Sequence, residues 1–285
     1  MSPILSNIYL HKLDEFVERE LIPQYTRGGC RKTNPEYKRV HRQLASARRR
    51  GDRAAARDLR KQLRTLPKAD PMDPGYRRLR YIRYADDHIL GFIGPEAEAE
   101  QIKARMAAFL RETLGLELNQ QKTLITHARS QPARFLGYHI KVQHCDAKIT
   151  KGQRGINGKI ALRVPPDVIK AQCARHREHG KPWHRSRLQN LDDYDIVRIY
   201  GAEYRGVVNY YLLARDVWRL RTLEWNAMTS MLKTLAAKHR SSVTKMAARH
   251  KAKIKTRDGL RTCYEAHGHG KVDHDAFMLV RAPAA

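Results

Sequence analysis

Acidic residues are scarce in this sequence. Its 285 residues include 29 Asp and Glu against 56 Lys and Arg, which leaves a formal net charge of +27. A field of that sign and size attracts polyanions and exceeds what solubility requires. Nucleic acid is therefore the expected partner, although a ribosomal protein or a protein of anionic membrane surfaces would share this balance.

Long hydrophobic runs and closely spaced cysteines are also missing. The first ten residues contain no basic leader with a long apolar run, and no later window reaches membrane-spanning length. We expect a soluble, cytoplasmic protein with no membrane partner. The scattered cysteines predict reduced thiols, because their spacing fits neither a disulfide framework nor a zinc finger. Cys263, His267, His269 and His274 have the residue types of a zinc site, but their spacing matches no common zinc finger. We interpret the segment that contains them as a hairpin turning at Gly268–Lys271.

The hydrophobic pattern predicts an α+β fold with two domains, at about 1–150 and 151–285. In the first domain we expect a helix over 3–21, a basic helical hairpin inserted at about 26–75, a β-hairpin over 79–93, and a helix from Pro95 to Gly115. The inserted hairpin carries fourteen Lys or Arg against three acids between Arg27 and Arg64. Short strands are expected at 124–125, 135–142 and 160–164, and helices dominate after 192.

The most informative motif is Tyr84-Ala85-Asp86-Asp87 at the tip of the expected β-hairpin. Nucleotidyl transfer uses two divalent metals, one at the attacking 3′ hydroxyl and one at the triphosphate, and hard carboxylate ligands suit Mg²⁺. A tight turn exposes two adjacent carboxylates, and the small Ala85 leaves room for a primer end. A plain Asp-Asp turn is the alternative, but apolar strands on both sides of the acids favour the catalytic interpretation.

Ordered sequence blocks around this motif resemble those of group II intron reverse transcriptase/maturases. SPILSNIYLHKLDEF at 2–16 resembles the palm helix that lines the nucleotide pocket, LGLELNQQKT at 114–123 resembles the block after the catalytic hairpin, and FLGYHI at 135–140 resembles the primer-side strand. The segments DPGYRRLRYIRYADD, GVVNYYLLARDVWRL and MLKTLAAKHRSSVTKM resemble the maturase branch rather than retroviral enzymes. The resemblance covers nearly the whole chain.

The resemblance implies an RNA-directed DNA polymerase with part of a right-hand palm followed by a mainly helical thumb/maturase region. It implies Mg²⁺ as the cofactor, with Asp86 and Asp87 as catalytic metal ligands. It also implies contacts to nucleotide or primer by Ser2, Asn7, Tyr84, Ala85 and Lys122.

Complete family members carry fingers and a further metal-binding aspartate upstream of the helix that opens this chain. Asp14 lies on that helix, and we interpret it as a surface residue or salt-bridge partner rather than a substitute ligand. We therefore expect a truncated or split gene product that does not polymerise alone and that an upstream reverse transcriptase fragment would complete.

The expected nucleic acid partners are intron RNA, template RNA and the RNA/DNA duplex. Basic clusters at the end of the inserted hairpin and in the second domain are the candidate RNA-binding residues: Arg48, Arg49, Arg50, Lys238, His239, Arg240 and Lys245. The aromatic residues at helical spacing in 200–225 are more typical of a core than of base stacking. Three hypotheses remain: a polymerase fragment, an RNA-binding maturase or remnant without catalysis, and an unrelated basic RNA-binding protein.

Overall fold

The computed structural model describes residues 3–145, 147–150, 153–256, 259–266 and 277–278. The chain forms two compact units, one made of Met1–Leu136 and Val142–Ile160, the other of Gly137–Lys141 and Ala161–Ala285. Helices and strands are mixed in both, as the predicted α+β class requires. Within the described ranges, no helix has both the length and the apolar character needed to cross a bilayer.

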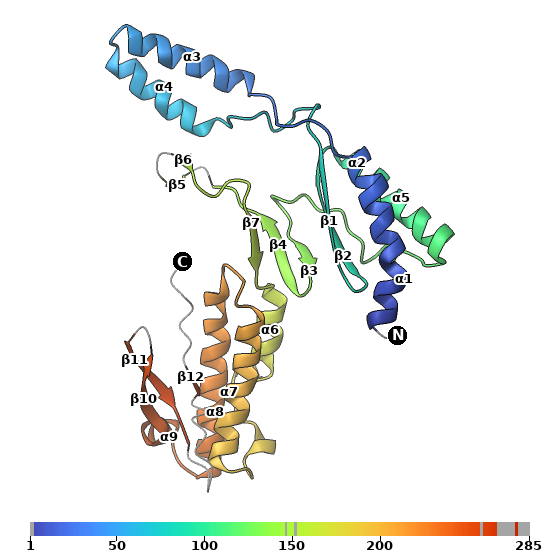
Figure 1. Ribbon diagram of the computed structural model, residues 1–285. Helices are drawn as coiled ribbons and strands as arrows, with labels where there is room; N and C mark the ends of the chain where they lie inside the picture. The colour runs from blue at the N-terminus through green and yellow to red at the C-terminus, as the bar shows by residue number, and fades with distance from the viewer. Residues whose placement is uncertain (1–2, 146, 151–152, 257–258, 267–276, 279–285) are drawn as a thin grey trace. The chain divides into compact units, whose positions relative to one another are not determined.

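The first unit has its core between one long N-terminal helix, a β-hairpin and a second long helix (Figure 1). Its elements are α1 (Pro3–Phe16), a π-helical turn (Val17–Leu21), α2 (Ile22–Gln24), α3 (Pro35–Arg49), α4 (Arg53–Thr65), β1 (Arg78–Tyr84), β2 (Asp87–Ile93), α5 (Glu96–Leu114), β3 (Ala133–Phe135), β5 (Ile149–Thr150) and β6 (Gln153–Arg154).

Helix α1 buries a different face from the one that its first residues suggest. Leu13 of α1 and Val17 and Leu21 of the π-helical turn that continues it are almost fully buried and belong to the same core cluster as Met106 of α5, whereas Ile8 is 66% exposed. The aromatic rings of Phe16 and Phe109 stack with their centroids 4.2 Å apart. Burying these side chains stabilises the unit by about 1.5–3 kcal/mol each.

The inserted basic hairpin forms as predicted. Asn34 caps α3 by accepting a hydrogen bond from the Glu36 amide, and Asp52 caps α4 in the same way through the Ala55 amide. Helices α3 and α4 run side by side away from the rest of the unit (Figure 1). Because α4 buries none of its residues, nearly all of its charge faces solvent.

Two of the expected strands differ in the structure. The segment 124–125 is not a strand. Leu124 is 72% exposed, and the Lys103 ammonium donates a hydrogen bond to the backbone carbonyl of the neighbouring Thr123. The expected strand 135–142 is interrupted after β3, because Leu136 and Gly137 both have positive φ, which no strand accommodates. The expected turn at Gly268–Lys271 lies outside the described residues.

The second unit is mainly helical, as predicted. Its elements are β4 (Tyr138–Val142), β7 (Ile160–Arg163), α6 (Pro166–Ala174), β8 (Arg177–Glu178), β9 (Lys181–Pro182), a 3₁₀ turn (Ser186–Leu188), α7 (Asp193–Tyr210), a second 3₁₀ turn (Val217–Leu220), α8 (Arg221–Lys238), α9 (Val243–His250), β10 (Lys251–Thr256), β11 (Gly259–Tyr264) and β12 (Phe277–Met278).

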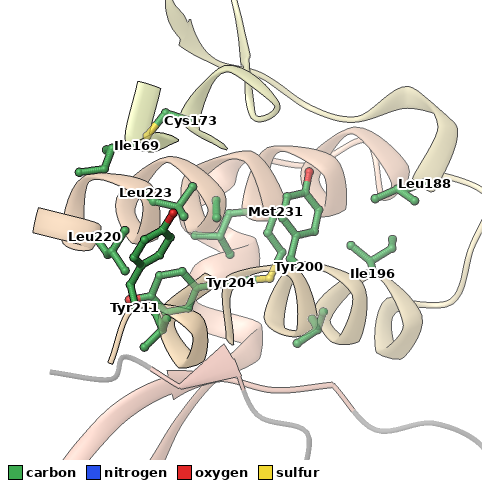
Figure 2. Packing of buried hydrophobic residues seen from close by; sticks show 14 of the residues in the cluster. Ile169, Cys173, Leu188, Ile196, Tyr200, Tyr204, Tyr211, Leu220, Leu223 and Met231 are labelled. Carbon is green, nitrogen blue, oxygen red and sulfur yellow. The ribbon is translucent and has the colours of Figure 1, made fainter. Parts of the chain in front are cut away.

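Three of the aromatic side chains in this unit form its core. Tyr200, Tyr204 and Tyr211 lie among Leu223, Met231 and their neighbours (Figure 2), which confirms the core interpretation for these rings. Tyr210, Trp218 and Trp225 are instead more than half exposed. The Tyr200 hydroxyl exchanges hydrogen bonds with Ser230 and Thr234 at 2.8 and 3.0 Å, so its polar end is satisfied inside the core.

One buried acid in this core makes stability depend on pH. Glu224 is 5% exposed, and its Oε1 atom has no hydrogen-bond partner among the described residues. Burial raises the pKa of Glu224 from 4.5 to about 7, against the opposing charge of Arg221. The resulting contribution to stability is fully present below about pH 4.5 and is lost as the pH rises through about 7.

We predict that Glu224→Gln raises the free energy of unfolding by up to about 3 kcal/mol near pH 8 and changes it little near pH 5. The amide keeps the shape of the side chain but carries no charge to bury. Urea unfolding at both pH values measures the difference. His176, whose pKa burial lowers to about 4, titrates in wild type and variant alike and cancels in the comparison. An equal difference at both pH values would contradict this account.

Candidate active site in the first unit

The paired aspartates lie at the tip of the β1–β2 hairpin. Tyr84 pairs with Asp87 as the last rung of the ladder, and Ala85 and Asp86 form a two-residue loop. Both carboxylates are exposed. The predicted placement of Asp86 and Asp87 at an exposed turn is therefore confirmed, while their chemical role stays a prediction.

The turn has a strained backbone. Ala85 has φ +53°, a region that favours glycine, and the positive φ at this first loop position matches a type II′ hairpin turn. A non-glycine residue held there costs on the order of 1 kcal/mol and persists only where the surroundings fix it. The contacts of the neighbouring residue supply that constraint.

Arg83 ties the turn to helix α1. Its Nε and Nη2 atoms donate to the two carboxylate oxygens of Asp14 at 2.8 and 2.5 Å, and its Nη1 donates to the Ala85 carbonyl at 2.6 Å and to Asn7 Oδ1 at 2.9 Å. The Tyr81 hydroxyl donates to Asp14 at 2.9 Å. We call these contacts the Arg83 brace. The brace connects the Ala85 carbonyl of the strained turn to α1 through the bidentate ion pair between Arg83 and Asp14.

The brace is partly shielded from water. The side chains of Arg83 and Asp14 are 10% and 23% exposed. The hydrogen bonds from Arg83 hold the pKa of Asp14 below its usual range, so the carboxylate is charged at neutral pH. The interpretation of Asp14 as a salt-bridge partner is confirmed, and Asn7 is likewise engaged by Arg83.

Strand alternation separates this brace from the exposed face of the hairpin. Leu79, Tyr81 and Arg83 are buried or half-buried on one face of β1, whereas Ile82 and Tyr84 are 62% and 67% exposed on the other. Asp87, the partner of Tyr84, belongs to the second face. The hairpin is a two-stranded sheet within the described residues. Its exposed face is therefore accessible to further elements or to nucleic acid.

The donor atoms present fit part of a Mg²⁺ site. Asp86 and Asp87 offer the hard carboxylate oxygens that Mg²⁺ prefers. The described residues contain no cluster of three or more His, Cys, Asp or Glu that could hold a metal ion. Asp14 does not extend the pair, because Arg83 and Tyr81 occupy its oxygens.

Comparison with known proteins identifies the family. A family model described as "Reverse transcriptase (RNA-dependent DNA polymerase)" matches residues 53–140, and one described as "Type II intron maturase" matches 167–259. The group II intron-encoded protein LtrA of Lactococcus lactis subsp. cremoris is 34% identical over 86% of this chain and 44% of its own length. The chain belongs to the group II intron reverse transcriptase/maturase family.

Other relatives extend the same likeness. The COX1/OXI3 intron 1 protein of Saccharomyces cerevisiae is 33% identical over 84% of this chain and 30% of its own length. Maturase K of Fagopyrum esculentum is 24% identical over 58% of this chain and 34% of its own length. This reverse transcriptase/maturase chain therefore spans less than half the length of these relatives.

The remaining predicted site residues lie on exposed turns or helix ends. Lys122 is exposed in a turn that the Asn119 side chain closes through the Lys122 amide. Arg48, Arg49 and Arg50 are exposed at the end of α3, where cations are favoured by the helix dipole. Ser2 lies outside the described residues.

The second-unit candidates divide into two kinds. Arg240 and Lys245 are exposed, whereas Lys238 and His239 both contact Asp193 at the start of α7, at 2.7 and 2.8 Å. Those two side chains fasten the end of α8 to α7. The motif search missed Arg83, although a charged residue on the buried face of an alternating strand signals a required acidic partner.

We predict that Asp14→Ala destabilises the first unit by about 3 kcal/mol, because it leaves the shielded Arg83 charge without a partner. The matched control is Glu15→Ala, which removes the neighbouring acid and its 3.0 Å pair with the 78% exposed Arg19. A surface pair of that kind contributes at most about 1 kcal/mol. Urea unfolding and amide exchange in β1 and β2 measure both effects. Equal costs for the two substitutions would show that the brace does not hold the hairpin.

Proposed function

We propose that this chain contributes part of the palm and the thumb/maturase region of a group II intron-encoded reverse transcriptase. In this proposal the first unit supplies palm elements and the second supplies the RNA-binding thumb/maturase region. The observation that supports it best is the exposed Asp86-Asp87 pair on a strained turn held by the Arg83 brace. A turn that served only to reverse the chain would not need two exposed acids, and glycine is the residue expected at its positive-φ position.

In this proposal Asp86 and Asp87 hold Mg²⁺ through their carboxylate oxygens. The ions supply charge neutralisation at the triphosphate and activation of the 3′ hydroxyl. The Arg83 brace keeps the carboxylates at the tip of the hairpin without neutralising them, because the guanidinium is already paired with Asp14. Ala85 and the exposed Tyr84 border the position of the primer end, and Lys122 is the proposed phosphate contact.

The basic residues of the chain support a role in binding RNA. The net charge of +27 favours phosphate contacts, and Arg48, Arg49, Arg50, Arg240 and Lys245 are exposed on helical ends and loops. Lys238 and His239 would act at this surface by fixing the end of α8 through Asp193. Intron RNA and template are the proposed partners, with the RNA/DNA duplex as the product that the palm and thumb enclose.

A second candidate function is RNA binding by a maturase without polymerisation. Two observations favour it: the described residues offer two carboxylates rather than three at the turn, and Asp14 is already engaged. Two-metal catalysis needs more ligands than this pair supplies, although phosphates and water complete many Mg²⁺ sites.

We predict that the 285-residue polypeptide does not extend a primer on an RNA template with Mg²⁺ by itself. Addition of a polypeptide that carries the fingers and first palm block expected of the family should restore extension, because it provides the further carboxylate. Asp86→Ala should lower the restored rate of extension by a factor of at least about 1,000, since the metal ligands act as a unit.

The matched control is Asp58→Ala, which removes an exposed acid of α4 that pairs with Lys61. It should leave extension unchanged. Extension by the polypeptide alone, or restored extension that survives Asp86→Ala, would contradict the polymerase proposal. Absence of extension in every mixture, with RNA binding retained, would support the maturase alternative.

A further inference from the structure

Arginine side chains surround an open hollow on the second unit. The hollow has a volume of about 670 Å³ and is lined by Arg175, Arg185, Ser186, Arg187 and Glu203. Arg175 follows the end of α6, Arg185 precedes the 3₁₀ turn that contains Ser186 and Arg187, and Glu203 belongs to α7. Segments that are apart in the sequence therefore bring three guanidinium groups to one place.

One of these arginines is fixed and neutralised. Arg185 donates from both terminal nitrogens to the Glu203 carboxylate at 2.8 and 3.1 Å. Its guanidinium lies 5.1 Å from the centroid of the fully buried Tyr200 ring, and its backbone amide donates to Thr234 at 3.0 Å. The pair forms a rigid wall of the hollow, because stacking and two hydrogen bonds restrict the guanidinium.

The other two arginines carry uncompensated charge. Arg175 and Arg187 are exposed, and within the described residues neither side chain has a hydrogen bond or ion pair. Behind them, His176 is 4% exposed, and burial lowers its pKa to about 4, so it adds no charge at neutral pH. Arg185 and Arg175 also lower the pKa of His176, whereas Glu203 raises it. The imidazole therefore lies close to these three charged groups. The hollow therefore has two free cations beside one neutralised pair.

Two guanidinium forks are suited to the oxygens of a phosphate. Glu203 disfavours a free dianion, but a carboxylate has about four lone-pair sites, and Arg185 occupies two of them. The remaining sites, together with the exposed Ser186 hydroxyl, can accept a hydrogen bond from a ribose 2′-hydroxyl, the group that distinguishes RNA from DNA. An open hollow with these groups matches a length of sugar–phosphate backbone better than an enclosed small molecule.

The geometry points to a subsite for the RNA backbone, in which Arg175 and Arg187 bind a phosphodiester and Glu203 accepts from a neighbouring 2′-hydroxyl. This inference rests on the proposed RNA-binding function of the second unit and names the residues and the chemical groups that it would use there.

The test is fluorescence anisotropy with a labelled RNA hairpin and the DNA hairpin of the same sequence, over a range of salt concentrations. Arg175→Gln with Arg187→Gln should weaken RNA binding by about tenfold per arginine and reduce the slope of log affinity against log salt by about 2. The matched control is Arg163→Gln with Lys170→Gln, which removes two exposed charges of the same unit outside the hollow. The control should lose less than threefold, or about 0.6 kcal/mol.

A third variant, Glu203→Gln, tests the ribose contact. It should bring the ratio of RNA to DNA affinity closer to one, because the amide is a weaker acceptor than the carboxylate. Equal losses in the arginine pair and its control, or an unchanged ratio in Glu203→Gln, would overturn the inference. Failure of the wild type to bind the RNA hairpin would instead contradict the proposed function itself, so the two failures are distinguishable.

Discussion

The ion pair between Arg83 and Asp14 is the interaction on which the candidate active site depends. It crosses from β1 to α1, and the same guanidinium donates to the Ala85 carbonyl of the strained turn. A two-stranded β-hairpin is only marginally stable by itself, and a positive φ at alanine destabilises its turn further. The core of α1, β1, β2 and α5 holds the hairpin against the helix, and the brace fixes its tip. Packing and a charged contact thus combine to expose Asp86 and Asp87 instead of burying them.

Each unit separates the charges that it needs for structure from those that it presents to solvent. In the first unit Asp14 binds Arg83, and the acids of the turn stay exposed. In the second unit Asp193 fastens Lys238 and His239, and Glu203 fastens Arg185, while Arg175 and Arg187 remain uncompensated. With 29 acids for 56 basic residues, the sequence cannot supply one acidic partner for each cation. The few acids that occupy shielded positions therefore determine which basic side chains are fixed and which can bind phosphate.

The sequence predicted the features that local patterns encode. Hydrophobic alternation located the β1–β2 hairpin, and helical spacing located the inserted helical hairpin and the tyrosine core of the second unit. The buried face of α1 was predicted less well, because Ile4, Leu5 and Ile8 continue the apolar pattern yet stay exposed. The prediction of a strand at 124–125 was wrong, because two consecutive apolar residues form a strand only where a partner strand is available. The Arg83 brace and the arginine hollow join residues tens of positions apart, and such contacts leave little trace in the sequence around each residue.

The most direct test of the central claim is broadening of backbone amide signals by Mn²⁺, a paramagnetic cation that also prefers oxygen ligands. If the Arg83 brace presents Asp86 and Asp87 as part of a cation site, the amides from Ala85 to His88 should broaden at the lowest Mn²⁺ concentrations in the wild type. Asp86→Ala should remove this effect, and Asp14→Ala, which frees the turn, should weaken it. Broadening centred elsewhere in the chain, or an unchanged response in Asp14→Ala, would contradict the account.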